Sequence, residues 1–291
     1  MLRLDGKVVA EARRARLKTR IETFVKTHGR KPGLAVVIVG HDPASQVYVK
    51  NKVKTTTELG MESTHIELAA DASEAEILRT VEKLNNDPKV DGILVQLPLP
   101  KNIDSNKIVE AIRPEKDPDG LTTANLGLLI AGRKRVAPCT PFGVMAILEH
   151  FKISVAGKRV VVIGRSNIVG KPMAQLLTDA DATVTLCHSK TKNLKHHTLD
   201  AEIVVVAAGR ERFLSRDYFA KDSVVIDVGM HRPTEGSHAG KLCGDVKFEE
   251  LEGHVQAATP VPGGVGPMTI QMLMENTVTL AELRAAAAKN T

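Results

Sequence analysis

The segment VVVIGRSNIVGKP (160–172) decides the fold, because an apolar, β-branched stretch runs through a glycine turn into a helical pattern. Gly164 permits a tight turn at the end of the strand, and Gly170 allows the helix to pack closely against it. The first turn of that helix would hold a pyrophosphate on its N–H groups. The match to the dinucleotide pattern G-x-G-x-x-G is imperfect, since Ser166 stands where the second glycine is usual. A plain strand–turn–helix therefore stays open as an alternative.

The same alternation of short apolar strands and amphipathic helices extends in both directions from this segment. Thr140-Pro141 predicts the start of a helix with Thr140 as its N-cap. In the C-terminal half we expect a helix from about Gly170 and strands at 158–164, 182–188, 202–209 and 223–229. In the N-terminal half we expect strands at 33–40, 63–69 and 90–100, and helices at 6–28, 45–60 and from the N-cap Ser73 to about Asn86. This order predicts an α/β fold, with parallel sheets covered by helices.

The length of 291 residues is about that of two domains. The first series of strands and helices ends near residue 140, and the second ends at the turn-rich PVPGGVGP. A final helix at 267–288 needs a surface to cover its apolar stripe, and we expect it to pack back on the first domain. The predicted domains are therefore residues 1–140 with 266–291, and residues 141–265.

The chain carries 40 Lys and Arg against 34 Asp and Glu, a formal net charge of +6. A basic balance is compatible with nucleic acid, but two Tyr, six Phe and no Trp make a poor stacking platform for single strands. The basic residues are also scattered along the sequence. We expect small anionic ligands and no specific binding of nucleic acid.

The composition also limits where the protein works. Its first residues lack the apolar stretch of a signal peptide, and no apolar run approaches the roughly 18 residues of a membrane span. The cysteines are Cys139, Cys187 and Cys243, which are odd in number, far apart and without a C-x-x-C pair. We expect a cytoplasmic protein with no membrane partner, no disulfide framework and no zinc knuckle.

The residues after the second strand of the dinucleotide segment indicate which nucleotide is bound. An NAD site places an acid there for the ribose 2′-hydroxyl, but this chain reads LCHSK (186–190), with no acid. The hydroxyl of Ser189 and the charge of Lys190 suit a 2′-phosphate, and Arg165 in the glycine turn would reach it. The pattern favours NADP over NAD, while a solvated loop remains the alternative for Ser189 and Lys190.

Polar residues of the first domain follow the ends of its strands. Tyr48 and Lys52 share one helix face, Gln96 closes a strand, and Asp119 lies in the turn KDPDG (116–120). Ligands of open α/β sheets bind at the carboxyl ends of the strands, so these side chains would meet in one pocket. Each also has an ordinary alternative: a solvated lysine, a tyrosine at the core edge, an aspartate in a turn. The ten His contain no H-E-x-x-H, and we expect no metal site.

Taken in order, the motifs of the chain resemble those of the bifunctional methylenetetrahydrofolate dehydrogenase / methenyltetrahydrofolate cyclohydrolase family. They cover almost the whole chain: SQVYVKNKVK (45–54), DGILVQLPLP (91–100), KDPDG (116–120), PCTPFG (138–143), GRSNIVGKP (164–172), CHSKT (187–191) and PVPGGVGPMT (260–269). The resemblance implies two α/β domains with a cleft between them, the second a Rossmann-type dinucleotide-binding domain. It also implies a homodimer formed through the cofactor domains.

The resemblance further implies an enzyme of one-carbon metabolism. NADP would oxidise 5,10-methylenetetrahydrofolate to the 5,10-methenyl form, which would then be hydrolysed to 10-formyltetrahydrofolate. Lys52 is then the central catalytic group, Gln96 positions it, Tyr48 lines the folate site and Asp119 anchors the pterin. The folate would be bordered by Gly263, Gly264 and Pro267, and the cofactor by Gly164, Arg165, Ser166, Ile168 and Ser189, of which Arg165 and Ser189 hold the 2′-phosphate.

These roles agree with the chemistry. Hydride transfer needs mainly orientation, and its methenyl product is a cation that a permanent charge on Lys52 would oppose. Hydrolysis needs a water deprotonated and an amine reprotonated, which a lysine with a pKa lowered by burial can do beside a neutral amide such as Gln96. Two alternatives remain: another two-domain NADP oxidoreductase such as a shikimate dehydrogenase, and a nucleotide sensor without turnover.

Overall fold

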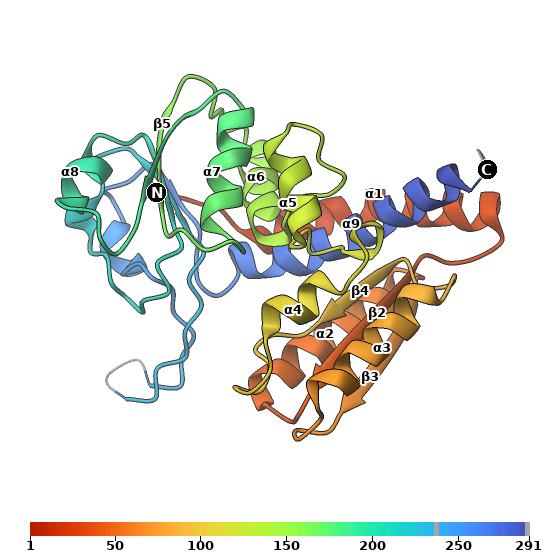
Figure 1. The fold of residues 1–291 in the computed structure, drawn as a ribbon. Coiled ribbons are helices and arrows are strands. Elements are labelled where there is room, and N and C mark those ends of the chain that lie inside the picture. Colours follow the sequence, from red (N-terminus) through yellow and green to blue (C-terminus); the bar gives the residue numbers. More distant parts are fainter. Residues whose placement is uncertain (236–238, 289–291) are drawn as a thin grey trace. The chain divides into compact units, whose positions relative to one another are not determined.

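The computed structural model describes residues 1–235 and 239–288, and its chain divides into two compact units (Figure 1). We call Met1–Ala12 with Pro138–Met272 the six-stranded unit, and Arg13–Ala137 with Leu273–Thr291 the three-stranded unit, after their sheets.

The three-stranded unit is a parallel sheet of order β3-β2-β4, with strands β2 (Gly33–Val39), β3 (Glu62–Leu68) and β4 (Gly92–Val95). Every residue of β2 and β4 is buried, as expected for strands covered on both faces. One face packs its valines against the apolar stripe of α3, with Ile77, Val81 and Leu84 in the same core. The helices between the strands are α2 (Pro43–Glu58), α3 (Glu74–Asn86), α4 (Ser105–Glu110) and α5 (Thr123–Ile130), with the 3-10 turn η1 (Pro114–Lys116).

The six-stranded unit is a parallel sheet of order β1-β9-β8-β7-β5-β6. Its strands are β1 (Leu2–Arg3), β5 (Arg159–Ile163), β6 (Thr183–Cys187), β7 (Ile203–Val206), β8 (Val224–Asp227) and β9 (Ala257–Ala258). Its shorter helices are α6 (Cys139–His150), α7 (Gly170–Asp179) and α8 (Leu194–Leu199), with the 3-10 turns η2 (Arg216–Tyr218) and η3 (Phe248–Leu251). The order reverses direction beside β5, and such a switch point is where open α/β sheets bind ligands.

Two long helices contribute residues to both units. These are α1 (Gly6–His28) and α9 (Val265–Ala287), and the division between the units falls inside each of them. Among the described residues, none of the helices combines the length and the apolar character that crossing a membrane requires.

The predicted α/β class and the parallel sheets are confirmed, and most predicted elements lie within two or three residues of those observed. Ser73 caps α3 as predicted, since its side chain accepts from the N–H of Glu76. The strand predicted at 90–100 ends at Val95, because the prolines that follow cannot donate to a ladder.

The predicted N-cap at Thr140 is wrong. Helix α6 starts two residues earlier, with Pro138 at the N-cap, and the Thr140 hydroxyl lies 3.0 Å from that of Thr269. The boundaries of the compact units also differ from the predicted domains at residues 1–12, 138–140 and 266–272, which lie in the six-stranded unit. Residues 1–12 belong to that unit because β1 pairs with β9, a strand of the six-stranded sheet.

Candidate active site

Helix α2 carries two of the predicted site residues and follows directly on strand β2. The chain leaves the strand through Gly40, whose positive φ of 78° favours glycine. Asp42 then caps the helix, accepting a 2.8 Å hydrogen bond from the N–H of Ser45. The helix therefore starts at the carboxyl end of a central strand, where ligands of such sheets bind.

Lys52 and Gln96 meet in the structure as predicted. The Nζ of Lys52 donates to Oε1 of Gln96 at 2.8 Å, and Nε2 of Gln96 donates to the carbonyl of Leu97 at 2.6 Å. The second bond turns the amide so that its oxygen faces the lysine. Both side chains are half-buried. A neutral acceptor thus holds the amine without fixing its charge as a carboxylate would.

Tyr48 and Asp119 belong to the same unit. Tyr48 lies one helical turn before Lys52 and is 39% exposed, which leaves its ring available to a ligand. Asp119 is half-buried in the loop that follows η1. By contrast, Lys54 is largely exposed and pairs with Glu58 at 3.7 Å, so it is a surface residue.

The glycine turn after β5 has the geometry that the sequence predicts. Gly164 has a φ of 121°, and a Cβ there would lie 2.1 Å from the carbonyl oxygen of Ala207. A Cβ on Gly170 would lie 2.0 Å from the carbonyl oxygen of Gly164. Neither neighbour is a side chain that could move aside. Both glycines are therefore required for the close approach of strand, turn and helix.

The side chain of Ser166 stabilises the turn at the position where the dinucleotide motif usually has its second glycine. Its Oγ accepts a 3.1 Å hydrogen bond from the N–H of Val169, which closes the turn before α7. The side chains of Arg165, Ser166 and Ile168 are exposed. They lie around the amino terminus of a ten-residue helix, where N–H groups and the helix dipole favour a phosphate.

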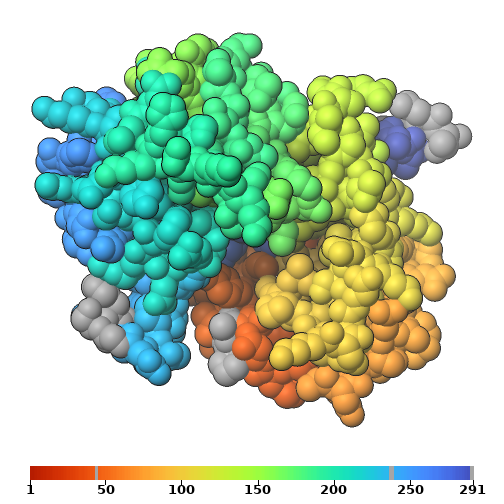
Figure 2. All heavy atoms as spheres, turned by 60° about the vertical axis from the view of Figure 1, so that its left-hand side comes forward, coloured from red at the N-terminus to blue at the C-terminus, as the bar shows by residue number. Residues whose placement is uncertain are grey.

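Ser189 lies at the same edge of the sheet, in the loop after β6. Ile163 and Cys187 are register partners at the ends of β5 and β6, so the residues that follow each strand leave the sheet side by side. The loop is closed by a 2.8 Å hydrogen bond from the N–H of His188 to Oγ1 of Thr191. Ser189 and Lys190 are exposed. Figure 2 shows these segments, green to teal, on the surface of the face drawn.

These residues fit a dinucleotide with a 2′-phosphate. The turn supplies a close backbone approach that any Cβ would block, and the helix supplies N–H donors. The loop after β6 offers a hydroxyl and a lysine, and no acid that would repel a phosphate.

Two buried aspartates, which the sequence analysis missed, organise the neighbouring strand ends. Asp245 accepts from the N–H groups of Ala208, Gly209 and Arg210 and lies 2.7 Å from Nε2 of His231. Asp227 accepts from the N–H groups of Gly229, Asp245 and Val246. Burial raises the pKa of the Asp227 carboxyl to about 7, although these N–H groups oppose the shift. The sequence signal of the two aspartates is weak, because DVG (227–229) and GDV (244–246) look like ordinary turn residues until their burial is known.

The loop predicted to border the folate lies before α9. The carbonyl of Gly263 accepts from the N–H of Gly6 at 2.9 Å, and Gly263 itself has a φ of 105°. The N–H of Gly264 donates to the carbonyl of Pro260 at 2.8 Å, and Pro267 is half-buried in the first turn of the helix. The loop is thus fixed by backbone contacts within the six-stranded unit. Over residues 1–235 and 239–288, no group of His, Cys, Asp and Glu has the arrangement of a metal site.

Two family models match the chain. The model "Tetrahydrofolate dehydrogenase/cyclohydrolase, catalytic domain" matches residues 4–119, and "Tetrahydrofolate dehydrogenase/cyclohydrolase, NAD(P)-binding domain" matches residues 138–285. The chain belongs to this family. The tetrahydrofolate dehydrogenase/cyclohydrolase models together cover Lys52, Gln96, Asp119 and the glycine turn.

Relatives within the tetrahydrofolate dehydrogenase/cyclohydrolase family match along the full length. The bifunctional protein FolD of Bdellovibrio bacteriovorus is 58% identical, with 98% of each chain covered. The crystal structure of the bifunctional FolD enzyme of Campylobacter jejuni is 45% identical, covers 98% of this chain and 99% of that one, and has a TM-score of 0.93. The Trypanosoma brucei FolD structure, described as complexed with NADP cofactor and inhibitor, is 36% identical, covers 98% of both chains and has a TM-score of 0.92. Membership decides against a shikimate dehydrogenase.

Proposed function

We propose that this protein oxidises 5,10-methylenetetrahydrofolate to 5,10-methenyltetrahydrofolate with NADP, and hydrolyses the product to 10-formyltetrahydrofolate in the same site. The observation that carries the proposal is the half-buried pair of Lys52 and Gln96, with Nζ and Oε1 2.8 Å apart. It lies in the part of the chain that matches the catalytic domain of the family.

Lys52 acts in hydrolysis by holding and moving a proton at Nζ. NADP, when bound, supplies the hydride acceptor, so for the oxidation the protein needs only to orient the folate and the cofactor. The methenyl product is a cation, and a lysine that stays charged would oppose its formation. Hydrolysis requires that a water lose a proton and that a ring nitrogen gain one. Gln96 accepts from the ammonium through Oε1 and adds no charge of its own.

The remaining side chains bind rather than react. Tyr48, exposed one turn from Lys52, lines the folate site, and Asp119 anchors the pterin through its carboxylate. In the six-stranded unit the folate is bordered by Gly263, Gly264 and Pro267.

Specificity for NADP comes from the edge formed by the ends of β5 and β6. Arg165 and Ser189 hold the 2′-phosphate, with Gly164, Ser166 and Ile168 against the rest of the cofactor. The arginine provides a charge-assisted, bidentate contact that NAD cannot use. The support is their exposure on neighbouring strand ends beside the amino terminus of α7.

We further propose a cytoplasmic homodimer formed through the six-stranded units. The protomer mass is 31.4 kDa, so light scattering after gel filtration should give twice that value. A mass of one protomer at micromolar concentration would contradict the dimer.

The function is tested by a spectrophotometric assay with methylenetetrahydrofolate and either NADP or NAD, reading reduced nucleotide and methenyl absorbance separately. We expect reduced NADP to form and the methenyl signal to decay faster than it does without enzyme. Binding of nucleotide with no turnover would instead support the sensor. Turnover of shikimate in place of the folate would overturn the assignment.

A further inference from the structure

A short segment of α9, Met274–Thr277, contacts all three elements of the three-stranded unit that carry a proposed folate-site residue. These elements are α2 with Tyr48 and Lys52, β4 leading to Gln96, and the loop with Asp119. The segment and all three elements belong to the three-stranded unit. Contacts from one rigid helix to all three would set their positions relative to one another.

Asn276 makes the contact with the loop. It is 2% exposed, and its Nδ2 donates to the carbonyl oxygens of Pro118 and Ala137, each at 2.8 Å. The Pro118 carbonyl belongs to the peptide unit that leads into Asp119. An amide has two N–H donors, and here both go to backbone segments far apart in sequence. The bond therefore fixes the peptide beside Asp119 directly.

Met274 makes the contact with α2. Its sulfur lies 3.3 Å from Oγ1 of Thr56, which also donates to the carbonyl of Lys52 at 2.7 Å. Both Met274 and Thr56 are fully buried. Thr56 lies one turn after Lys52 on the same helix face. The segment of α9 thus touches α2 at the turn that carries the lysine.

Thr277 makes the contact with β4. It is fully buried, and a Cβ built on Gly92 would lie 3.1 Å from its Oγ1 and 3.1 Å from Cγ of Pro118. The strand therefore passes close to both the helix and the loop. Gln96 leaves the same strand, and its N–H donates to the carbonyl of Val37 at 2.8 Å.

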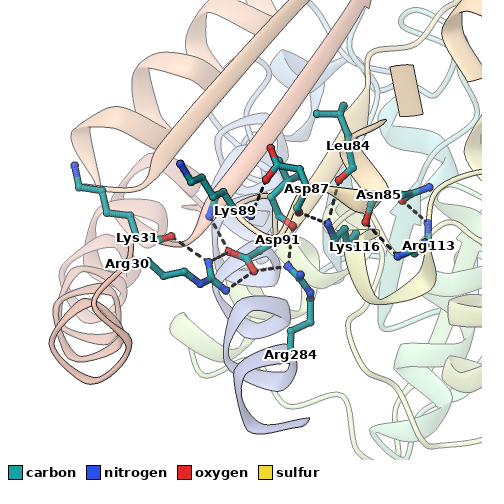
Figure 3. Close-up of polar contacts among 12 residues, drawn as sticks. Arg30, Lys31, Leu84, Asn85, Asp87, Lys89, Asp91, Arg113, Lys116 and Arg284 are labelled. Atoms are coloured by element: carbon teal, nitrogen blue, oxygen red, sulfur yellow. Dashed lines mark hydrogen bonds and ion pairs between the residues drawn. The ribbon is translucent and has the colours of Figure 1, made fainter. Parts of the chain in front are cut away.

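Lys116, the last residue of η1, and Asp117 hold the start of this loop independently of Asn276. Figure 3 shows Lys116 reaching the end of α3, where Nζ donates to the carbonyls of Leu84 at 3.0 Å and Asp87 at 2.6 Å. The carboxylate of Asp117 accepts from the N–H of Thr122 and from Nδ2 of Asn125. These bonds anchor residues 116 and 117, and Asn276 holds the peptide that follows them.

We propose that Asn276 is a positioning residue of the folate site, which holds the Pro118–Asp119 peptide in register with α2 and β4. This rests on the proposed function, because Asp119 matters only if the unit binds a pterin. The amide acts through Asp119 and touches no substrate itself. An apolar side chain of the same volume would fill the space but leave two carbonyl oxygens without these donors.

The test compares Asn276→Leu with Asn85→Leu in the full-length protein. Asn85 is a matched control, because it is also buried and also bonds two backbone groups, the carbonyl of Ala111 and the N–H of Arg113. We expect N276L to raise the KM for methylenetetrahydrofolate roughly tenfold or more, at unchanged affinity for NADP. N85L should change that KM less than about twofold at a comparable loss of thermal stability.

A second readout needs no activity. Hydrogen exchange should become faster in peptides covering 117–122 and 48–56 of N276L, and less so in N85L. If N276L does not fold, Asn276→Ser, which keeps one donor and leaves room for water, takes its place with the same criteria. Equal folate effects in both variants, or no effect in either, overturn the proposal. A wild-type protein without turnover would refute the proposed function, while the exchange rates would still decide whether Asn276 holds the loop.

Discussion

At the scale of single residues, the pairing of Lys52 with an amide sets what the amine can do. A carboxylate at 2.8 Å would stabilise the ammonium, whereas the neutral Oε1 of Gln96 accepts an N–H from the charged and from the neutral amine alike. The second hydrogen bond of Gln96, to the carbonyl of Leu97, presents the oxygen to the lysine. The pair therefore suits a group that must both take up and release a proton.

Replacing Lys52 by Met should lower cyclohydrolase turnover by about 100-fold or more, because the proton carrier is lost at nearly constant volume. The affinity for NADP should not change, since the cofactor residues lie in the other unit. Decay of methenyl absorbance measures the first quantity, and calorimetric titration with NADP the second. Lys54→Met is the control, since Lys54 is exposed on the same helix. Full cyclohydrolase activity in K52M would remove Lys52 from its role.

Lys116 predicts a pH dependence of stability. Burial lowers its pKa to about 8, with a further contribution from the charge of Arg284, while the carboxylates of Asp91 and Asp87 oppose the shift. Between that pKa and the ordinary 10.5 the unfolded chain holds the proton and the folded chain does not, so the free energy of unfolding rises with pH. Below about 8 both states are charged and this contribution is constant.

Compared with Lys116→Met, the wild type should therefore gain stability between pH 8 and pH 10, by at most about 3 kcal/mol. Urea unfolding at several pH values in this window measures the difference. Parallel pH profiles for the two proteins would show that Lys116 keeps its ordinary titration in the fold.

The sequence predicted that Lys52 and Gln96 lie close together, because short-range patterns of helix and strand place both residues. Helical spacing and the end of a strand place them at one edge of a sheet. Asn276 and Asp245 could not be found in this way. Each bonds to backbone groups more than 30 residues away, and in the sequence they are ordinary polar residues in a helix and a turn. They differ from other polar residues in being buried, and their burial cannot be predicted from the residues next to them in the sequence.

At the scale of elements, the turn between β5 and α7 shows how two glycines and a serine join a strand closely to a helix. The two glycines let backbone atoms meet where any Cβ would clash, and Ser166 closes the turn through its side chain. This part of the fold was predictable because steric rules act over a few residues. The start of α6 was not, since the Thr140 hydroxyl is taken by Thr269 from a distant helix.

Gly170→Ala should destabilise the protein by roughly 1–3 kcal/mol and weaken NADP binding, because its Cβ would overlap the Gly164 carbonyl at 2.0 Å. Gly127→Ala is the contrasting variant, since Gly127 lies exposed in α5 with no atom within 4 Å of a Cβ. That change should raise stability by up to about 1 kcal/mol. Urea unfolding with and without NADP distinguishes them. Wild-type stability of G170A would contradict this prediction, because it would mean that the backbone around Gly164 moves aside to make room for the Cβ.

At the scale of the whole molecule, the formal charge of +6 allows weak attraction to polyanions but no readout of bases. We expect duplex DNA to bind only at low ionic strength, independently of sequence, and below detection near 150 mM salt, where exposed charges are screened. Fluorescence anisotropy over a salt series with two unrelated duplexes tests this. Affinity that persists at high salt, or that differs between the duplexes, would require a nucleic-acid site.

The two-domain α/β plan was predictable from the alternation of strands and helices, but the division of the chain was not. The strand β1 has two residues, too few for any periodicity, and its pairing with β9 is visible only in three dimensions. For the same reason the N-terminal residues were expected with the nearest domain in sequence.

The pairing of β1 with β9 also determines when this protein can finish folding on the ribosome. The ribosome translates Ala257 more than 250 residues after its partner Leu2. At about 5–20 residues per second this is a delay on the order of 10 to 50 s. Once β8 (Val224–Asp227) has emerged, the sheet has an open edge there until β9 (Ala257–Ala258) follows, and this edge could pair with neighbouring chains. We expect chaperones to act on this chain mainly in that interval.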